Sequence, residues 1–327
     1  MTTRVVIVII LFLLLIVIVV ACNRHHITPV ESEHTAHPKN KKTMLTSRYA
    51  TLAAVKKDGL ALRNASDAIK ADREIVLVAV KQSGYALKYA SNELKADREV
   101  VLVAVRQHGY ALQFAPYELL NDREIVLASV QQDGEALAYA SDEHWADREI
   151  VLAAVEQNGE ALSCASDELR ADRKVVLTAV KQDGFALLFA SEELQADREV
   201  VLASVQQNGY VLRCLSYEFK ADREVVLTAV QQSGRALEHA SEELLGDREV
   251  VLAAVKQFCY ALEYAPEEFK GDREVVLAAV KQHGAVLHWA SVELQADPLL
   301  KSWAAQGSRG ARGWRKVRET CKAKRIM

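Results

Sequence analysis

The chain has 327 residues, of which 50% are apolar, 26% charged and 6% aromatic, with only 5 prolines. This composition excludes a disordered chain, a collagen-like chain and a small disulfide scaffold. The net charge of −3 is divided unevenly, with +3 on residues 1–46, −14 on residues 47–297 and +8 on residues 298–327. We therefore divide the chain into a hydrophobic anchor or signal segment, a polar linker, a helical repeat array and a basic tail, at residues 1–22, 23–46, 47–297 and 298–327.

Residues 5–21 form an uncharged apolar run of seventeen residues. As a helix this run is about 26 Å long, which is just enough to cross a bilayer. It also exceeds the roughly 7 to 15 apolar residues of an ordinary signal peptide. We favour a retained single-pass membrane anchor. Two alternatives stay open: a lipoprotein lipidated at Cys22, because the Val-Val-Ala-Cys sequence that ends there resembles a bacterial lipoprotein signal, and a secreted protein after signal cleavage.

Residues 23–46 are polar, contain two prolines and indicate a flexible spacer. The spacer holds four histidines, at His25, His26, His34 and His37. Metal ligands need a fixed geometry, and a spacer does not provide one. We therefore interpret these histidines as part of a solvated linker and predict no metal site in the chain.

An internal repeat of 25 residues organises the rest of the chain. A degenerate copy begins at Ser47, so ten units lie between residues 47 and 296. Atypical terminal units are expected where a repeat array must be capped. The tripeptide Asp-Arg-Glu, or a near copy, begins at Asp72, Asp97, Asp122, Asp147, Asp172, Asp197, Asp222, Asp247 and Asp272.

Each unit, numbered from its aspartate as position 1, predicts one longer helix followed by a short broken one. The aspartate is the N-cap, a glutamate follows in the first turn, and positions 4, 5, 6, 8 and 9 are apolar. Position 13 is glycine in nine of ten units and is expected to end the helix as a C-cap. Position 20 is serine or proline and interrupts the second helix. One continuous helix is excluded, since each internal proline costs about 3 kcal/mol.

Such a unit cannot bury its apolar face alone, so neighbouring units must stack. The sequence predicts an all-α fold, a right-handed α-helical solenoid of ten 25-residue repeats, about 90 Å long if helices pack about 9 Å apart. Cys164 and Cys214 lie two units apart, roughly 20 Å, which is too far for a disulfide whose Cα atoms must be within about 7 Å. We interpret both as core residues.

The repeated pattern DREVVLAAVKQ-G-AL-YAS-EL resembles the tandem helical repeats of the domain-of-unknown-function family numbered 4116. The resemblance covers about three quarters of the chain and implies helical tandem repeats. It implies no activity. Ser47, Lys174 and Cys259 depart from the pattern and affect single caps only.

Positions 14 and 17 vary most in size and charge from unit to unit, so they are the candidates for contact with a partner. A row of exposed tyrosines is typical of an interface. The competing interpretation is that position 14 makes the apolar contact that closes a glycine C-cap. Position 18 is mostly aromatic and is interpreted as core, and His239 at that position is expected to be a hydrogen-bonded or edge histidine. The candidate partner-binding residues at position 14 are Tyr85, Tyr110, Glu135, Glu160, Phe185, Tyr210, Arg235 and Tyr260.

Nothing in the sequence indicates an enzyme or a cofactor site. An active site needs one constellation of different groups, whereas the Asp-Arg-Glu motif recurs in unit after unit and fits N-caps with ion pairs between units. We therefore expect a membrane-tethered scaffold that binds a protein partner. The alternative is binding of nucleic acid or anionic lipid through the basic tail, in which arginine, glycine and one tryptophan are mixed. A tail folded back on the acidic array is a third option. The sequence predicts no oligomeric state.

Overall fold

The computed structural model describes residues 47–307, and all regular structure within that range is helical. Each complete unit contains a ten-residue α-helix, a six-residue 3-10 helix and a short α-helix of four or five residues. The fold is therefore an all-α array of repeated helices. The predicted second, broken helix of each unit is a 3-10 helix followed by a separate α-helical turn.

The long helices are α2 (Arg48–Lys57), α4 (Arg73–Gln82), α6 (Arg98–Gln107), α8 (Arg123–Gln132), α10 (Arg148–Gln157), α12 (Arg173–Gln182), α14 (Arg198–Gln207), α16 (Arg223–Gln232), α18 (Arg248–Gln257), α20 (Arg273–Gln282) and α22 (Pro298–Gly307). The 3-10 helices are η1 (Gly59–Asn64), η2 (Gly84–Tyr89), η3 (Gly109–Phe114), η4 (Gly134–Tyr139), η5 (Gly159–Cys164), η6 (Gly184–Phe189), η7 (Gly209–Cys214), η8 (Gly234–His239), η9 (Cys259–Tyr264) and η10 (Gly284–Trp289). The short helices are α3 (Asp67–Lys70), α5 (Asn92–Lys95), α7 (Tyr117–Leu120), α9 (Asp142–Trp145), α11 (Asp167–Arg170), α13 (Glu192–Gln195), α15 (Tyr217–Lys220), α17 (Glu242–Leu245), α19 (Glu267–Lys270) and α21 (Val292–Ala296).

The long helices begin as the sequence predicts. In α14, for example, the Asp197 carboxylate accepts the backbone N–H groups of Glu199 and Val200. This N-cap satisfies donors that have no partner inside the helix. Buried positions 4, 5, 8 and 9 then form one stripe along each of the long helices α4 to α20, with positions 6 and 7 partly buried beside it.

The recurring glycine does not act as the predicted C-cap. A glycine C-cap adopts positive φ, and among residues 47–307 no residue has positive φ. The helix ends instead at position 12, in extended conformation, as at Asn208 with φ −146° and ψ 100°. Glycine is required because the next unit lies so close: a Cβ on Gly209 would be 2.1 Å from the carbonyl oxygen of Ala229 and 2.9 Å from its carbonyl carbon.

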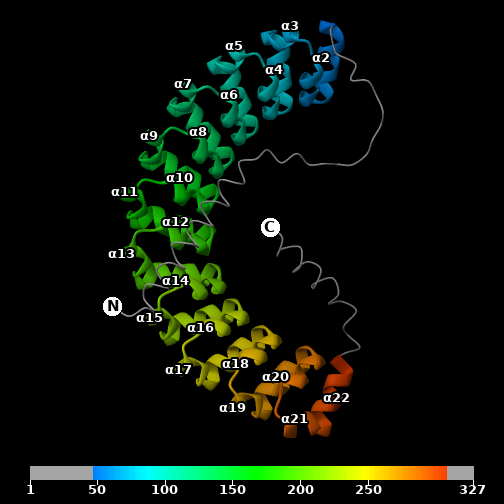
Figure 1. The fold of residues 1–327 in the computed structure, drawn as a ribbon, viewed down its shortest axis with the longest axis vertical. Helices are drawn as coiled ribbons and strands as arrows, with labels where there is room; N and C mark the ends of the chain where they lie inside the picture. Colours follow the sequence, from blue (N-terminus) through cyan, green and yellow to red (C-terminus); the bar gives the residue numbers. More distant parts are fainter. Residues whose placement is uncertain (1–46, 308–327) are drawn as a thin grey trace, which may run out of the picture. The chain divides into compact units, whose positions relative to one another are not determined.

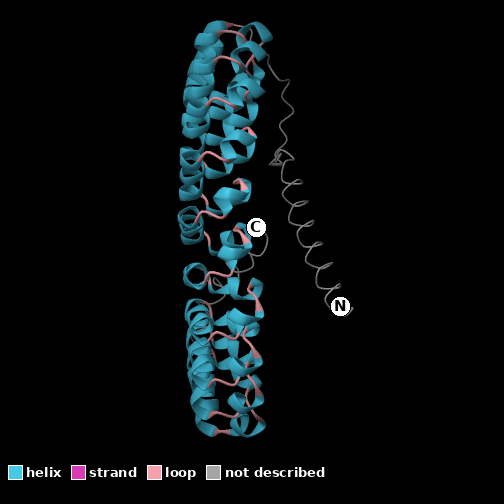
Figure 2. Cartoon of the chain, turned by 90° about the vertical axis from the view of Figure 1, so that its left-hand side faces the viewer, coloured by secondary structure: helices cyan, strands magenta, loops and turns pink. Residues whose placement is uncertain are grey.

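The units stack in register, each on the next. Every long helix packs on the long helix that follows it, and each 3-10 helix packs between its own long helix and the following one. Consecutive units therefore follow one another along an arc, with the short helices at its outer rim (Figure 1). Figure 2 shows the array turned by 90°, as two columns of helices. One core of buried valine, leucine, isoleucine and alanine side chains runs through the whole array.

Residues 298–307, which the sequence analysis assigned to the basic tail, continue the array as α22. Asp297 accepts the N–H groups of Leu299 and Leu300, and α22 packs on α20 and η10 with Leu300 fully buried. Pro298 does not break this helix because it is its first residue, where a missing N–H and a fixed φ are both tolerated. Among the described residues, none of the helices has the length and apolar character required to span a membrane, and the anchor predicted at residues 5–21 lies outside that range.

The Gly209→Ala variant tests the close approach between units. The added methyl group meets backbone atoms of the next helix, which cannot rotate away, so we expect a loss of about 1 to 3 kcal/mol in the free energy of unfolding. Urea denaturation followed by circular dichroism measures this. Gly246→Ala is the matched control, because its new Cβ meets no atom of a neighbouring unit: the nearest atom, the carbonyl oxygen of Glu243 in the same short helix, lies 3.2 Å away. Equal losses in the two variants contradict this explanation.

Candidate interaction surface

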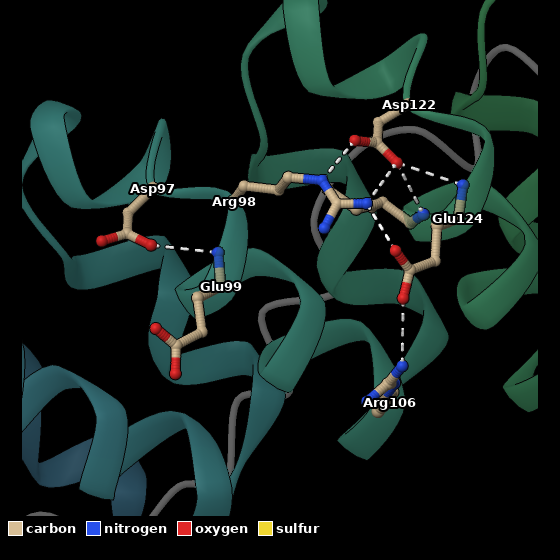
Figure 3. Close-up of polar contacts among 7 residues, drawn as sticks. Asp97, Arg98, Glu99, Arg106, Asp122 and Glu124 are labelled. Atoms are coloured by element: carbon tan, nitrogen blue, oxygen red, sulfur yellow. Dashed lines mark hydrogen bonds and ion pairs between the residues drawn. The ribbon is translucent and has the colours of Figure 1, made fainter.

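Arginine and carboxylate side chains join each unit to the next. Arg98, at position 2 of its unit, donates from Nε to Asp122 Oδ2 at 2.6 Å and from Nη2 to Glu124 Oε2 at 2.5 Å (Figure 3). Asp122 simultaneously caps its own helix, and Glu124 also accepts from Arg106 at 3.3 Å. The same contact recurs between successive units from Arg48 onward, so we call it the arginine ladder.

The ladder stops at both ends of the array. Ser47 and Tyr49 stand where a unit preceding the first would need Asp and Glu as acceptors, and Pro298 stands where the last helix would need a donating arginine. Within the ladder Lys174 replaces one glutamate, and Arg148 accordingly binds Asp172 alone. The ladder thus follows the stacking of the units, as the sequence analysis expected of N-caps with ion pairs.

Arginine contacts also shift the titration of the capping aspartates. The Arg73 guanidinium lowers the pKa of Asp97, and the equivalent arginines lower the pKa of Asp122 and Asp147. Backbone N–H groups of the capped helix act in the same direction, whereas burial opposes them.

The candidate residues at position 14 lie at the second residue of the 3-10 helices η2 to η9. The structure brings them together with side chains that the sequence analysis did not combine with them: the residues at position 12 and position 18 of the following unit. Tyr85 packs on the ring of His108 with centroids 4.9 Å apart, and Tyr110 packs on the ring of Tyr139 at 5.9 Å. We call the position-12, position-14 and position-18 residues of units 2 to 10 the variable ridge.

Aromatic and cationic groups dominate the C-terminal part of the variable ridge. Tyr210 lies beneath two guanidinium groups, those of Arg213 at 5.3 Å and Arg235 at 5.6 Å, and packs on the ring of His239. His239 is half-buried, as expected of an edge histidine, and its buried Nε2 has no hydrogen-bond partner within the described part of the chain. Tyr260 packs on the ring of His283, one unit further on.

The middle of the variable ridge is acidic. Glu135 accepts a hydrogen bond from Asn158 at 2.9 Å. Partial burial of its carboxyl group raises the pKa of Glu160, and the charges of Asp183 and Glu135 add to this effect. Burial likewise raises the pKa of Asp133. None of these four carboxylates forms an ion pair with any residue in the range 47–307. This segment therefore carries negative charge without a local counter-charge.

The eight candidates differ in exposure. Tyr85, Glu135, Glu160 and Arg235 are exposed, whereas Tyr110, Phe185, Tyr210 and Tyr260 are half-buried against the next unit. Since the helix has no glycine C-cap, the interpretation of position 14 as the closing contact of such a cap is wrong. Position 18, interpreted as core, is half-buried throughout and contributes its edge to the variable ridge.

The remaining sequence predictions concern other parts of the chain. Cys22 lies outside the described residues. Cys164 and Cys214 are unpaired, half-buried cysteines. Within residues 47–307, histidine, cysteine and carboxylate side chains nowhere form a group of three able to hold a metal ion.

Acidification tests the arginine ladder. A carboxylate whose pKa is lower in the folded state contributes stability above its unfolded pKa of about 3.9, and that contribution is lost as pH falls through the folded value. We expect the free energy of unfolding to fall steeply below about pH 4. This loss of stability with falling pH should be smaller in the Arg98→Gln variant, which lacks the ion pairs with Asp122 and Glu124. Urea titrations between pH 2 and pH 7 measure the slope; parallel curves for variant and parent would exclude a role for the ladder.

Glu160→Gln tests whether the acidic segment costs stability. The pKa of Glu160 is raised by folding, so its contribution favours the folded state below its unfolded pKa of about 4.3 and is lost as pH rises. We therefore expect this variant to unfold at a higher temperature than the parent at pH 7 and at a similar one at pH 3.5. Calorimetry at both pH values measures the difference. Glu193→Gln, an exposed carboxylate on α13, should change neither midpoint.

Comparison with known proteins gives one family. The family described as "Domain of unknown function (DUF4116)" matches in tandem, each match spanning two 25-residue units. No curated protein and no solved structure matches the chain. The matched residues are 51–95, 97–145, 147–195, 197–245 and 247–295. With well over half of its length covered by these matches, the chain belongs to the DUF4116 family of tandem helical repeats.

Proposed function

We propose that this protein is a membrane-tethered scaffold that binds a protein partner along the variable ridge and does not catalyse a reaction. One observation carries the proposal. The arginine ladder and the core are nearly the same in every unit, whereas the variable ridge changes from unit to unit while remaining continuous from one unit to the next. A surface that differs along its length can distinguish one partner from another, and a uniform one cannot.

The chemistry of the variable ridge favours a partner with a basic centre. Asp133, Glu135, Glu160 and Asp183 face no counter-charge within the described residues. Tyrosine rings lie on both sides of them, at Tyr110 and Tyr210 on η3 and η7. Tyrosine and arginine are among the residue types most enriched in the energetic hot spots of interfaces. A lysine- or arginine-containing segment laid across units 3 to 7 satisfies both features.

Two further features of the proposal come from the sequence alone. The tether is the apolar run at residues 5–21, or a lipid at Cys22, or it is absent after signal cleavage. The second feature is the right-handed sense of the solenoid. Both stay predictions.

The second candidate function is binding of nucleic acid or anionic lipid through the basic tail. Its support is the charge of residues 298–327, which is +8 against −14 for the array. Binding of this kind weakens steeply as salt rises, because it depends on release of counterions. It also does not depend on the identity of the residues of the variable ridge.

Affinity capture from native membranes separates these functions. Three baits are compared with the full chain: one lacking residues 308–327, the double variant Glu135→Lys with Glu160→Lys, and a control double variant Glu143→Lys with Glu168→Lys, two exposed carboxylates on the short helices α9 and α11 at the rim of the same two units. We expect one set of protein partners that persists without the tail, persists in the rim control, and falls at least about tenfold in the ridge variant, as truncation of interface hot spots does.

Capture that is lost with the tail, is sensitive to nuclease or to anionic vesicles, and is unchanged in the ridge variant refutes the scaffold function and supports the second candidate. Mass spectrometry of the N-terminal peptide of the same bait determines how the chain is attached to the membrane. A peptide that begins at Met1 identifies a retained anchor, and one that begins at a lipidated Cys22 identifies a lipoprotein.

A further inference from the structure

Neighbouring 3-10 helices do not pack equally closely along the array. Position 15 lies at their contact and is a small alanine in eight of the ten units, whereas Val211 and Val286 occupy it in units 7 and 10. The two loosest pairs of 3-10 helices are η6 with η7 and η9 with η10, the pairs whose second helix carries the valine. The larger side chain holds the helices apart, as overpacking at a close contact does.

The boundary between units 6 and 7, which we call the seam, is formed by η6 and α13 on one side and by η7 and α15 on the other. It also lacks a hydrogen bond that joins the short helices elsewhere. Where position 20 is serine, the backbone N–H of this serine donates to the carbonyl oxygen of position 24 in the preceding unit. Ser191 donates to Arg170 at 2.9 Å, and Ser241 donates to Lys220 at 2.8 Å. The equivalent bond from Ser216 to Gln195 is not formed. Ser216 does carry the N–H, unlike the prolines at this position in units 3 and 9, so the missing bond is a feature of this pair of units.

Two unusual residues line the same seam. Leu215 stands at position 19, where every other unit has alanine. Cys214 stands at position 18, where six units carry an aromatic ring, so the volume of a ring is absent there. Together with Val211 these residues distinguish unit 7 from its neighbours.

A cavity of about 230 Å³ results, open to solvent. Most ligand pockets are larger, about 300 to 1,000 Å³, so this one has the size of a single large side chain. Its apolar lining comes from both units and includes Leu187, Cys214 and Phe219. Glu192 and Glu218 lie at its edge and are exposed.

The entrance carries an exposed apolar side chain. Leu188 is 41% exposed and lines the cavity. It stands at position 17, where the other units have charged, polar or small residues. Gln195 donates to the carbonyl of Leu188 at 3.3 Å and to that of Ala190 at 2.8 Å, which fixes this wall. Leu188 thus extends the apolar lining of the cavity to the protein surface.

We propose that the cavity between units 6 and 7 receives Trp314 from the basic tail of a second copy of this chain. Trp314 is the single aromatic residue of residues 308–327, and Arg312, Arg315 and Lys316 surround it. An indole ring matches this cavity in size and finds its apolar partners in Leu187, Leu188 and Phe219, and this placement brings the adjacent cations to the carboxylates of Glu192 and Glu218. The inference is independent of the proposed scaffold function.

Chain length assigns the tail to a second copy. From Gly307, where α22 ends, seven residues lead to Trp314, and fully extended they span at most about 25 Å. The seam lies four units before α22, which is about 36 Å if helices pack about 9 Å apart. The tail of the same copy is therefore too short to place Trp314 in the cavity.

The inference predicts that the full chain associates with itself. Analytical ultracentrifugation in detergent over a concentration series measures this association. We expect Trp314→Ala to weaken association at least about tenfold, as loss of a buried aromatic anchor does. Cys214→Phe, which fills the cavity, should have the same effect. Cys164→Phe is the matched control, at position 18 of unit 5, and should leave association unchanged. Thermal melts identify a variant whose array is unfolded, and Trp314→Ala lies outside the array.

A crosslinking experiment tests whether residue 314 contacts the cavity of its own chain or that of a second copy. Two differently tagged full chains are mixed, one carrying a photoreactive phenylalanine at position 314 and the other of natural sequence. Crosslinks to residues 187–219 of the second copy are the expected result. A chain that is monomeric at all concentrations overturns the inference, as does association indifferent to both Trp314→Ala and Cys214→Phe, or crosslinks confined to one copy.

Discussion

The array depends on the distance between the start of each 3-10 helix and the long helix of the following unit. At Gly209 this distance is so short that no Cβ fits beside the carbonyl group of Ala229. The contact joins backbone to backbone, so it is independent of most side chains and recurs once per 25 residues. Where Cys259 replaces the glycine, α20 packs less closely on α18 and η9 than the equivalent helices do elsewhere. Because the backbone sets the stacking, the side chains at positions 12, 14 and 17 are free to differ.

The sequence predicted those features that have a local cause. The period, the aspartate caps and the buried stripe each follow from one unit read alone, as Asp197 with Val200 and Val201 illustrates. The role of the glycine did not follow, because a C-cap and a close interhelical contact require the same residue and differ only in the sign of φ. Nor did the 3-10 conformation of Gly209–Cys214, since six residues give no pattern that separates a 3.0-residue from a 3.6-residue turn.

The candidate surface was predicted only in part, because its contacts are made between units and not within one unit. Position 14 was identified from its variation, but its partners lie about 25 residues further along, at His108 for Tyr85 and at Asn158 for Glu135. A single unit does not reveal which residues of the next one it touches. Variation at position 12, from His108 to Asp133 and Phe258, was visible in the sequence and is the signal that could have extended the surface. The opening at Val211 depends on a contact between units and was equally hidden.

The two kinds of contact between units have different consequences for recognition. The arginine ladder is the same between each pair of units, so a partner that bound it would bind at any pair. The ladder also ends at Ser47, which lacks the acceptor carboxylate, and at Pro298, which lacks the donor guanidinium. End-to-end stacking of copies through the ladder is therefore disfavoured, which is a device by which repeat arrays avoid open-ended polymers. Specific association must then use a place that occurs once. In the described part of the chain the acidic segment around Glu160 and the seam at Ser216 have this property, because each depends on side chains that the other units lack.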